Sequence, residues 1–312
     1  MENLLVSYCL FVYNQEKYVR ESLEGALAQS YSPLEIIVSD DCSNDNTVEV
    51  IQKVLADYKG PHDVRFNRND KNIGLGGHFS KVVGQLARGS HVVTVGGDDI
   101  SEPDHVEMAV RLIREQESTT LIDLSARTID TKGEILSLSN GPRSFQRLTL
   151  EDYLVSARFP KTCAPARIFL KEFYDMFGEI HADCKTEDSV MVFRALLSGG
   201  YSRAPDIAIK YRRHQEALSS HGQWKRLSPR AIIEQYRRDA KIANERGLID
   251  GRTAVVIGLR ISMEALERYS RSRFRSKSLS YNLVRLVEKL LFLIYRTWAK
   301  ISMRIYRKSI FL

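Results

Sequence analysis

Cysteine is scarce in this 312-residue chain, which contains only four. Cys9, Cys42, Cys163 and Cys184 are widely spaced, and no two of them form a CxxC pair. This spacing argues against a zinc site and against a disulfide framework, because both need grouped or regularly spaced cysteines. A reducing cytoplasm is the environment that fits this usage.

Targeting segments and long apolar runs are also missing. Residues 1–3 lead directly into a strand-like run at Leu4, without the basic and apolar parts or the cleavage site of a signal peptide. The longest uncharged apolar stretch near the C-terminus, Leu290 to Tyr295, falls far short of the ~20 residues that span a bilayer. We therefore expect no export, no transmembrane helix and a cytoplasmic location.

Two nucleotide-binding motifs are absent. A dinucleotide-dependent oxidoreductase carries G-x-G-x-x-G at its first strand-to-helix turn, but here that turn reads Val12-Tyr13-Asn14-Gln15. A Walker lysine motif is absent as well. These absences argue against an oxidoreductase of that type and against a P-loop enzyme.

Charge is unevenly distributed along the chain, whose formal net charge is +7. From Ser270 onward eleven lysines and arginines are accompanied by one acid, Glu288, so the basic excess belongs to the tail and the remaining chain is slightly acidic. A basic terminus on an acidic body indicates an anionic partner surface, either lipid headgroups or nucleic acid.

The first half of the chain alternates apolar runs of strand length with segments of helical period. This alternation is typical of a mainly parallel sheet that is covered by helices. The predicted fold class is therefore α/β, with a Rossmann-like central sheet. The predicted strands are Leu4–Val12, Leu34–Val38, Val64–Phe66, His91–Val95 and Leu121–Leu124.

The pattern becomes irregular from about Arg127. We predict a hairpin turn at Thr131-Lys132-Gly133, followed by a polar loop and shorter elements. Beyond Ser219 the strand patterns stop, and three helical stretches follow near residues 228–246, 251–271 and 278–308. This predicts two parts, a catalytic domain over residues 1–220 and a helical C-terminal region over residues 221–312.

Two acidic pairs follow predicted strands. Asp40 and Asp41 come directly after Ile36–Val38, and Asp98 and Asp99 follow another strand behind two glycines. Open α/β folds bind ligands at the carboxyl ends of their strands. Carboxylates completed by phosphate oxygens are the usual ligands of Mg²⁺ or Mn²⁺. The alternatives are helix capping for the first pair and a solvated acidic turn for the second.

Polar residues in the second half add a base and cations. Asp188 lies in the first turn of a predicted helix, where the macrodipole favours an ionised carboxylate that can accept a proton from a hydroxyl. The alternative is a helix N-terminal acid without a further role. Arg212, Arg213 and His214 follow a short predicted strand, Ile207–Lys210, and suit a diphosphate or a metal shell. Exposed basic residues at a strand end are the alternative for them.

In their order, these motifs resemble those of family 2 glycosyltransferases with the GT-A fold, particularly enzymes of bacterial surface-polysaccharide assembly. The resemblance covers about residues 4–220. It runs through VSYCLFVYNQEKYV, EIIVSDDCSNDNT, NIGLGGHF, VTVGGDDISEPD, TEDSVMVFRALLSGG and YRRHQEALS. It implies a GT-A domain that transfers a sugar from a nucleoside diphosphate donor.

The resemblance also implies roles for single residues. Asp188 matches the general base, Asp98 the ribose-side acid and Asp99 the metal ligand. The chain departs from the family at Phe11 and Val12, where a Pro-Thr or Pro-Ser pair is usual, and at Cys42, where a glycine is usual. Our predicted nucleotide-sugar site comprises Tyr13, Asp41, Asn72, Gly74, Asp98, Arg212 and Arg213, and the predicted metal ligands are Asp99 and His214 for Mg²⁺ or Mn²⁺.

The implied reaction is a direct displacement with inversion at the anomeric carbon. The expected partners are a nucleotide-diphosphate sugar donor and a glycan or lipid-linked saccharide acceptor, as in synthesis of capsule, O-antigen or exopolysaccharide. A non-catalytic scaffold that binds membrane or nucleic acid through the basic tail is the rival hypothesis. The presence of Asp98, Asp99 and Asp188 favours the enzyme.

The tail, residues 278–308, is predicted to form a basic amphipathic helix. Apolar residues occupy some faces of this helix, and one face carries the basic residues Arg285, Lys289, Arg296, Lys300, Arg304 and Arg307. Helices of this kind lie in a lipid headgroup layer. The alternative is a helix that packs on the core with a solvated basic side. We expect an anionic membrane partner, a peripheral location on the inner face of the cell membrane, and no nucleic-acid partner.

Overall fold

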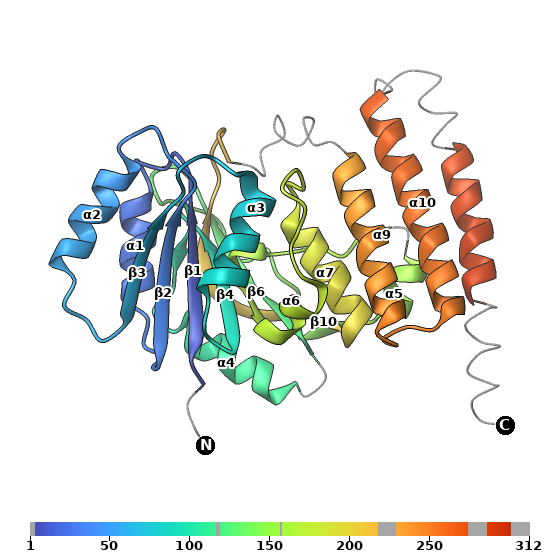
Figure 1. Cartoon of the computed structure of the whole chain (residues 1–312), viewed down its shortest axis with the longest axis horizontal. Helices are drawn as coiled ribbons and strands as arrows, with labels where there is room; N and C mark the ends of the chain where they lie inside the picture. Colours follow the sequence, from blue (N-terminus) through green and yellow to red (C-terminus); the bar gives the residue numbers. More distant parts are fainter. Residues whose placement is uncertain (1–3, 117–118, 157, 218–228, 274–285, 301–312) are drawn as a thin grey trace.

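The computed structural model describes residues 4–116, 119–156, 158–217, 229–273 and 286–300. Within these residues a mixed sheet stands between helices on both of its faces, and the C-terminal helices are ranged beside it (Figure 1). None of the described helices is long and apolar enough to cross a bilayer.

The sheet has the strand order β3-β2-β1-β4-β9-β6-β10-β5, with β7 paired to β6 and β8 paired to β10. β1 to β4 are parallel to one another, β6 and β10 are parallel, and β9 runs antiparallel between β4 and β6. The predicted α/β fold with a mainly parallel sheet is therefore confirmed. The strands are β1 (Val6–Val12), β2 (Leu34–Asp40), β3 (Asp63–Arg68), β4 (His91–Gly96), β5 (Ile100–Ser101), β6 (Leu121–Ile129), β7 (Ile135–Ser137), β8 (Gln146–Leu148), β9 (Arg167–Leu170) and β10 (Tyr201–Arg212).

Helices cover both faces of this sheet. The pattern of helix after strand holds through the first half, as the sequence predicts, and the predicted hairpin turn at Thr131-Lys132-Gly133 joins β6 to β7. The helices are α1 (Val19–Leu27), α2 (Thr47–Asp57), α3 (Gly74–Lys81) with its π-helical continuation η1 (Val82–Leu86), α4 (His105–Glu115), α5 (Leu150–Val155), the 3-10 turn η2 (Ala164–Ala166), α6 (Lys171–Phe177), α7 (Glu187–Ser198), α9 (Pro229–Glu245), α10 (Gly251–Arg273) and a final helix over residues 286–300.

The two faces of the sheet bury separate apolar clusters. Along β1, Tyr8 and Leu10 join a cluster with α1, α2 and α4, whereas Cys9 joins a cluster with α3, α6 and α7. Successive strand residues point to opposite faces, so a strand that is covered on both sides must be apolar or small throughout. All seven residues of β2 are buried, and its buried acid Glu35 is an exception to this rule, because it forms ion pairs with Arg65 and Arg88.

β9 was not predicted from the sequence. Its four residues begin with Arg167, and this charge interrupts the apolar pattern that marks a strand. In the structure Arg167 is buried because it forms an ion pair with Asp123 on β6, with 2.6 Å between Nε and Oδ1. A buried charge is tolerated when it is paired and hydrogen-bonded. The partner lies far away in the sequence, so local patterns could not indicate this strand.

The C-terminal helices share the apolar cluster that contains Cys9 and residues of α3, α6 and α7. Tyr236 of α9, Ile257 of α10 and Ala299 of the final helix belong to the same cluster as Phe193 of α7. α9, α10 and the final helix lie side by side next to α7 (Figure 1). The predicted boundary between residues 220 and 221 falls in 218–228, outside the described residues, so the division into two domains stays a prediction.

Candidate active site

Three parallel strands of the sheet end at one level. In the register of β1, Val12 lies opposite Asp40 of β2, and Phe11 lies opposite Gly96 of β4. The backbone continues this pairing beyond the strands, because the Asp41 N–H donates to the Val12 carbonyl over 2.9 Å and the Gly97 N–H donates to the Phe11 carbonyl over 2.8 Å. The turns after β1, β2 and β4 therefore meet at the carboxyl edge, as expected for an open α/β ligand site.

Asp41 holds the loop that precedes α3. Its Oδ1 accepts hydrogen bonds from Asn69 Nδ2 (2.8 Å) and from the Ile73 N–H (3.0 Å), and its Oδ2 accepts from the Gly74 N–H (3.1 Å). The Asn72 side chain also accepts from the Gly74 N–H, over 3.1 Å. Gly74 has φ of +74°, which favours glycine. The structure thus brings together three residues that the sequence indicates for the donor site.

Tyr13 stands at the rim of the same edge, with 46% of its surface exposed. The residues that follow it are tied to the turn after β2. The Asn14 N–H donates to Ser43 Oγ, and the Gln15 N–H donates to Thr47 Oγ1, both over 2.8 Å. Two turns that are far apart in the sequence are therefore joined by hydrogen bonds beside the exposed Tyr13.

The two acids after β4 differ sharply in accessibility. Asp99 is 1% exposed, and its Oδ1 accepts the Arg212 N–H over 2.8 Å. Burial, and next the negative charge of Asp98, raise the pKa of Asp99 well above its usual value. The side chain of Asp98 is 17% exposed, and its Oδ2 lies 2.9 Å from His214 Nε2. This geometry is at odds with the expectation that Asp99 binds a metal, because the accessible carboxylate belongs to Asp98.

Gly96 and Gly97, which precede Asp98, lie where an added side chain would be crowded. A Cβ at Gly97 would lie 2.3 Å from Gln15 Oε1, and a Cβ at Gly96 would lie 2.8 Å from Asp98 Oδ1. A side chain at either glycine would therefore require the Gln15 or the Asp98 side chain to shift. Gln15 is missing from the predicted site, and its buried Oε1 has no hydrogen-bond partner.

Arg212 holds the Asp98 turn in place through its guanidinium group. Its guanidinium donates to the carbonyl of Asp98 (3.0 Å), to the carbonyl of Asp130 (3.2 Å) and to Glu21 Oε2 (2.5 Å). The side chain is buried, so it is not available for the direct diphosphate contact that we expected. Arg213, the next residue, is exposed.

Tyr18 connects Arg212 to His214. Its ring centroid lies 4.9 Å from the Arg212 guanidinium carbon and 5.0 Å from the His214 ring. Nδ1 of His214 is buried without a partner. Tyr18 was missed in the sequence because it precedes α1 as an ordinary amphipathic aromatic residue, and its contacts come from β10 and the segment after it.

Asp188 lies in the first turn of α7, as predicted. Its Oδ2 accepts from Thr162 Oγ1, and its Oδ1 accepts from the Ser189 N–H, both over 2.7 Å. Arg167 donates to the Asp188 carbonyl over 3.2 Å, and Arg167 lies opposite Thr94 of β4 in the sheet. Asp188 is thus anchored beside the strand that ends at the Asp98 turn.

A close backbone contact joins the donor loop to the segment before Asp188. A Cβ at Gly76 of α3 would lie 2.3 Å from the His181 carbonyl oxygen and 2.8 Å from that of Cys184.

Glu187, the residue before Asp188, has its pKa raised to about 8 by burial and then by the negative charge of Asp188. Within the described residues, no group of three or more His, Cys, Asp or Glu side chains is arranged to hold a metal ion.

Known proteins share this sequence pattern and this fold. The chain is 34% identical to chondroitin synthase of Escherichia coli over 133 residues, which are 43% of this chain and 19% of that protein. The chain covers less than two thirds of the length of the curated relatives that it matches.

Two solved structures have the same architecture. TarS of S. aureus, solved as residues 1–349 with UDP-GlcNAc, has a TM-score of 0.63 and 18% identity, and the match covers 98% of this chain and 92% of that one. A mannosyltransferase of Pyrobaculum calidifontis, solved with GDP-Man and Mn²⁺, has a TM-score of 0.56 and 15% identity, with coverage of 99% and 87%. At these identities the likeness concerns the fold, which is the GT-A fold that the sequence predicts.

The family assignment rests on a sequence model. The model described as glycosyl transferase family 2 matches residues 7–174, more than half of the chain. This range contains β1 from its second residue, β2 to β4 and the turns that carry Tyr13, Asp41 and Asp98. The chain therefore belongs to glycosyltransferase family 2 and is a glycosyltransferase with the GT-A fold.

Proposed function

We propose that this enzyme transfers a sugar from a nucleoside diphosphate donor to a hydroxyl of an acceptor, with inversion at the anomeric carbon. The observation that carries this proposal is the anchoring of Asp188 beside β4. Arg167 donates to the Asp188 carbonyl and lies opposite Thr94, two residues before the end of the strand that leads to Asp98. A base close to an anion-binding edge of the sheet is what a displacement of a diphosphate requires.

The donor pocket that we propose consists of Tyr13, Asp41, Asn72, Gly74 and Asp98. The exposed Tyr13 ring is suited to contact the nucleotide base. Asp41 fixes the loop of Asn72 and Gly74 through the hydrogen bonds at its two carboxylate oxygens. UDP-GlcNAc and GDP-Man, bound in the two structures of similar fold, support a nucleotide-sugar donor here.

Asp98 and His214 fit a divalent cation better than Asp99 does. Their Oδ2 and Nε2 atoms lie 2.9 Å apart, close to the ~3 Å between neighbouring ligands of an octahedral ion with bonds of about 2.1 Å. Two protein ligands suffice where the diphosphate and water complete the shell. A bound Mg²⁺ or Mn²⁺ would neutralise charge on the departing diphosphate. The Mn²⁺ complex of the similar mannosyltransferase supports this choice.

Asp188 is the general base in this proposal. Its carboxylate takes the proton of the acceptor hydroxyl while the acceptor oxygen forms a bond to the anomeric carbon. The bond from that carbon to the diphosphate oxygen breaks, and the electron pair leaves with the diphosphate. Hydrogen bonds from Thr162 and from the Ser189 N–H keep the Asp188 carboxylate in one orientation. Arg213 is exposed and precedes His214 in the sequence, and in this proposal it is a cation that contacts the leaving diphosphate.

The acceptor class that we propose is a glycan or a lipid-linked saccharide of a surface polysaccharide such as capsule, O-antigen or exopolysaccharide. The relative named chondroitin synthase supports a polysaccharide product. Since the chain spans only part of that relative, the acceptor and the pathway belong to this proposal and not to the family assignment.

A donor panel tests the proposed function. Purified enzyme is incubated with UDP- and GDP-sugars, Mn²⁺ and a saccharide acceptor panel, and the anomeric configuration of the product is read by NMR. Asp188→Asn should lower turnover by roughly 10²- to 10⁴-fold while donor affinity is kept. Asp175→Asn makes the same change at an exposed aspartate of α6 and should have no effect. Retention of configuration, or normal turnover by Asp188→Asn, would contradict the mechanism.

A further inference from the structure

The final helix, residues 286–300, attaches to the protein by a narrow face. Glu288, Tyr295 and Ala299 are buried, and Phe292 is half-buried. These positions follow the spacing of three, four and seven residues that marks one side of an α-helix. Arg260 of α10 lies against this side, with its guanidinium carbon 5.8 Å from the centroid of the Phe292 ring. Among the residues that the structure describes, those outside the final helix therefore cover only this strip of it.

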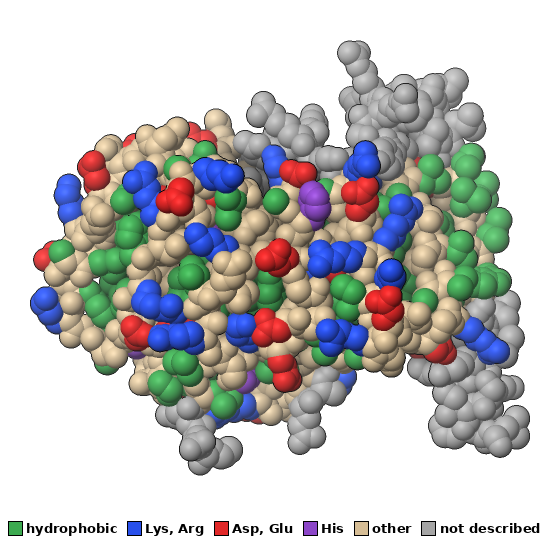
Figure 2. All heavy atoms as spheres, viewed as in Figure 1, with side chains coloured by type: hydrophobic (Ala, Val, Ile, Leu, Met, Phe, Trp, Pro, Cys, Tyr) green, Lys and Arg blue, Asp and Glu red, His purple; other side chains and the backbone are tan. Residues whose placement is uncertain are grey.

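An apolar surface remains uncovered on the rest of this helix. Seven large apolar side chains are each between 42% and 68% exposed. At 100° per residue they occupy a broad arc that lies opposite the buried strip. Hydrophobic side chains gather at this edge of the molecule, over the final helix (Figure 2). The residues of this apolar arc are Leu286, Val287, Leu290, Leu291, Leu293, Ile294 and Trp298.

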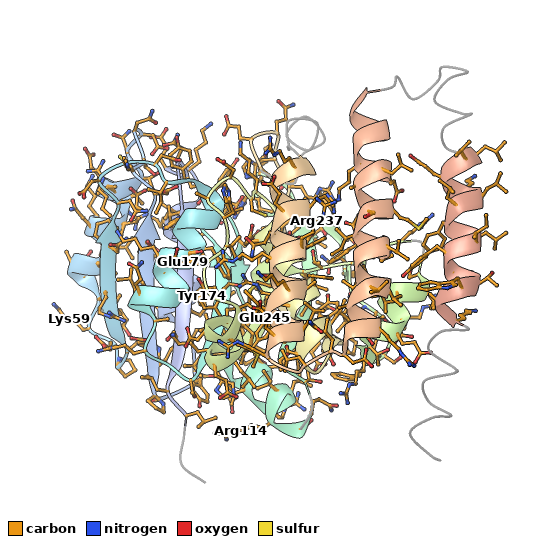
Figure 3. All side chains as sticks on the ribbon, turned by 45° about the vertical axis from the view of Figure 1, so that its right-hand side comes forward. Lys59, Arg114, Tyr174, Glu179, Arg237 and Glu245 are labelled. Carbon is orange, nitrogen blue, oxygen red and sulfur yellow. The ribbon has the colours of Figure 1, made fainter. Side chains whose placement is uncertain are left out.

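A basic stripe runs between the buried strip and the apolar arc. Lys289, Arg296 and Lys300 are exposed and fall within about 40° of one another on the helix. The one acid of the helix, Glu288, is on the buried side. Figure 3 shows side chains on the side of the final helix that is turned away from α10. The exposed surface is thus apolar with a cationic margin.

We infer that this face docks the enzyme onto an anionic lipid bilayer, with the final helix lying in the plane of the headgroups. A helix that binds at such an interface buries its apolar arc among the upper acyl chains and places Lys and Arg at the level of the phosphates. The apolar arc and the basic stripe of residues 286–300 supply these two surfaces. The buried strip attaches the helix to the protein body on the opposite side. An arc of this size also exceeds the scattered apolar residues that are normal on a monomer surface.

Two other occupants fit this face less well. A second copy of the same face would bring two basic stripes together, and like charges across an interface are unfavourable. A nucleic acid would bind the three basic residues through its phosphates, which dominate binding of this kind. It would leave the seven apolar side chains in water. A bilayer with anionic lipids is complementary to both stripes at once.

Vesicle flotation of the full chain tests this inference. Vesicles of phosphatidylcholine with about 30% phosphatidylserine are compared with vesicles of phosphatidylcholine alone, without donor or acceptor. The wild type should float with the anionic vesicles. Leu290→Ser together with Ile294→Ser should lower the partition coefficient at least ~10-fold, because the arc loses apolar area. Lys289→Gln, Arg296→Gln and Lys300→Gln together should lower it by roughly 10- to 100-fold on anionic vesicles only.

A matched control separates this face from general apolar exposure. Leu136→Ser together with Leu138→Ser removes two equally exposed leucines at and beyond β7 and should leave flotation unchanged. All variants change exposed side chains, so their melting temperatures should equal that of the wild type. Wild type that stays with the buffer, or arc variants that float like the wild type, would overturn the inference. A vesicle-free dimer that disappears in the Leu290 and Ile294 variant would overturn it in favour of a second copy.

This inference goes beyond the proposed sugar transfer and does not depend on it. Lipid binding is measured without catalysis, and the variants keep every residue of the candidate active site. A failed flotation would leave the donor assays untouched, and a failed donor assay would leave the lipid result untouched. If both hold, a lipid-linked saccharide becomes the acceptor class that best fits the enzyme's location.

Discussion

Arg194 and Asp239 form an ion pair in which neither side chain is exposed. Arg194 Nε lies 2.9 Å from Asp239 Oδ2, and its Nη2 lies 3.2 Å from Oδ1. Arg194 belongs to α7, the helix that starts with Glu187 and Asp188, and Asp239 belongs to α9. Gln235 of α9 extends this contact, because its Nε2 donates to Asp239 and its Oε1 accepts the His181 N–H. The C-terminal helix α9 thus holds the segment and the helix that carry the proposed base.

Asp239→Asn should be strongly destabilising. The change leaves the Arg194 charge buried without its counter-charge, which costs roughly 3–5 kcal/mol in the free energy of unfolding. Urea denaturation followed by circular dichroism measures this loss. Glu234→Gln removes the exposed partner of Arg230 on the same helix and should cost no more than about 0.5 kcal/mol. Equal effects of the two substitutions would show that α9 does not depend on the buried pair.

Local sequence patterns were sufficient for the parts of the fold in which neighbours along the chain pack together. The apolar runs of β1, β2 and β4 and the positions of Asp41, Asp98 and Asp188 at element ends follow from alternation and helix period. β9 was not predicted because the charge of Arg167 interrupts the apolar pattern of a strand. Its burial depends on the ion pair with Asp123, which is distant in the sequence. The distinct surroundings of Asp98 and Asp99 were not predicted either, since β10 supplies the Arg212 N–H and the segment after β10 supplies His214, both from more than a hundred residues away.

Asp98 and Asp99 should respond differently to removal of their charge. Asp98→Asn should weaken Mn²⁺-dependent binding of the donor by at least about 10-fold, because it removes the accessible anionic ligand beside His214. Asp99→Asn keeps an oxygen that can accept the Arg212 N–H, so it should change this affinity by less than about 3-fold. Isothermal titration of the donor with and without Mn²⁺ makes the comparison. A large loss in Asp99→Asn with no loss in Asp98→Asn would restore Asp99 as the metal ligand.

Gly76→Ala should separate the donor loop from the segment before Asp188. The new Cβ would lie 2.3 Å from the His181 carbonyl oxygen, and a backbone atom cannot rotate away as a side chain can. Overpacking of this kind costs roughly 1–3 kcal/mol. Differential scanning calorimetry should show a lower melting temperature.

Gly258→Ala provides the control for this substitution. Gly258 is exposed in α10, and a Cβ there would meet nothing within 4 Å. Alanine has the higher helix propensity, so this variant should gain about 0.5–1 kcal/mol in stability. Opposite shifts in melting temperature at the two positions are expected. A loss at both positions would indicate that the contact between α3 and the 181–184 segment is not the cause.

Glu187 should make the stability of the enzyme fall as the pH rises. Burial, and then the charge of Asp188, raise the pKa of Glu187 to about 8 in the folded state, whereas a glutamate in the unfolded chain titrates near 4.5. The unfolded state therefore releases its proton first, and the stabilising contribution, fully present below pH 4.5, is lost as the pH rises from 4.5 through 8. The loss should be on the order of a few kcal/mol. Glu187→Gln stays neutral and should be more stable than the wild type at pH 9.

The test is the difference between two stability curves, because other groups titrate in both proteins. The free energy of unfolding is measured by urea denaturation between pH 4 and 9 for the wild type and for Glu187→Gln, and the gap between the curves should widen from about pH 4.5 and level off above pH 8. Glu172→Gln, which removes an exposed carboxyl from α6, should follow the wild type across this range. A constant gap for Glu187→Gln would contradict the prediction, because it would mean that folding does not raise the pKa of Glu187.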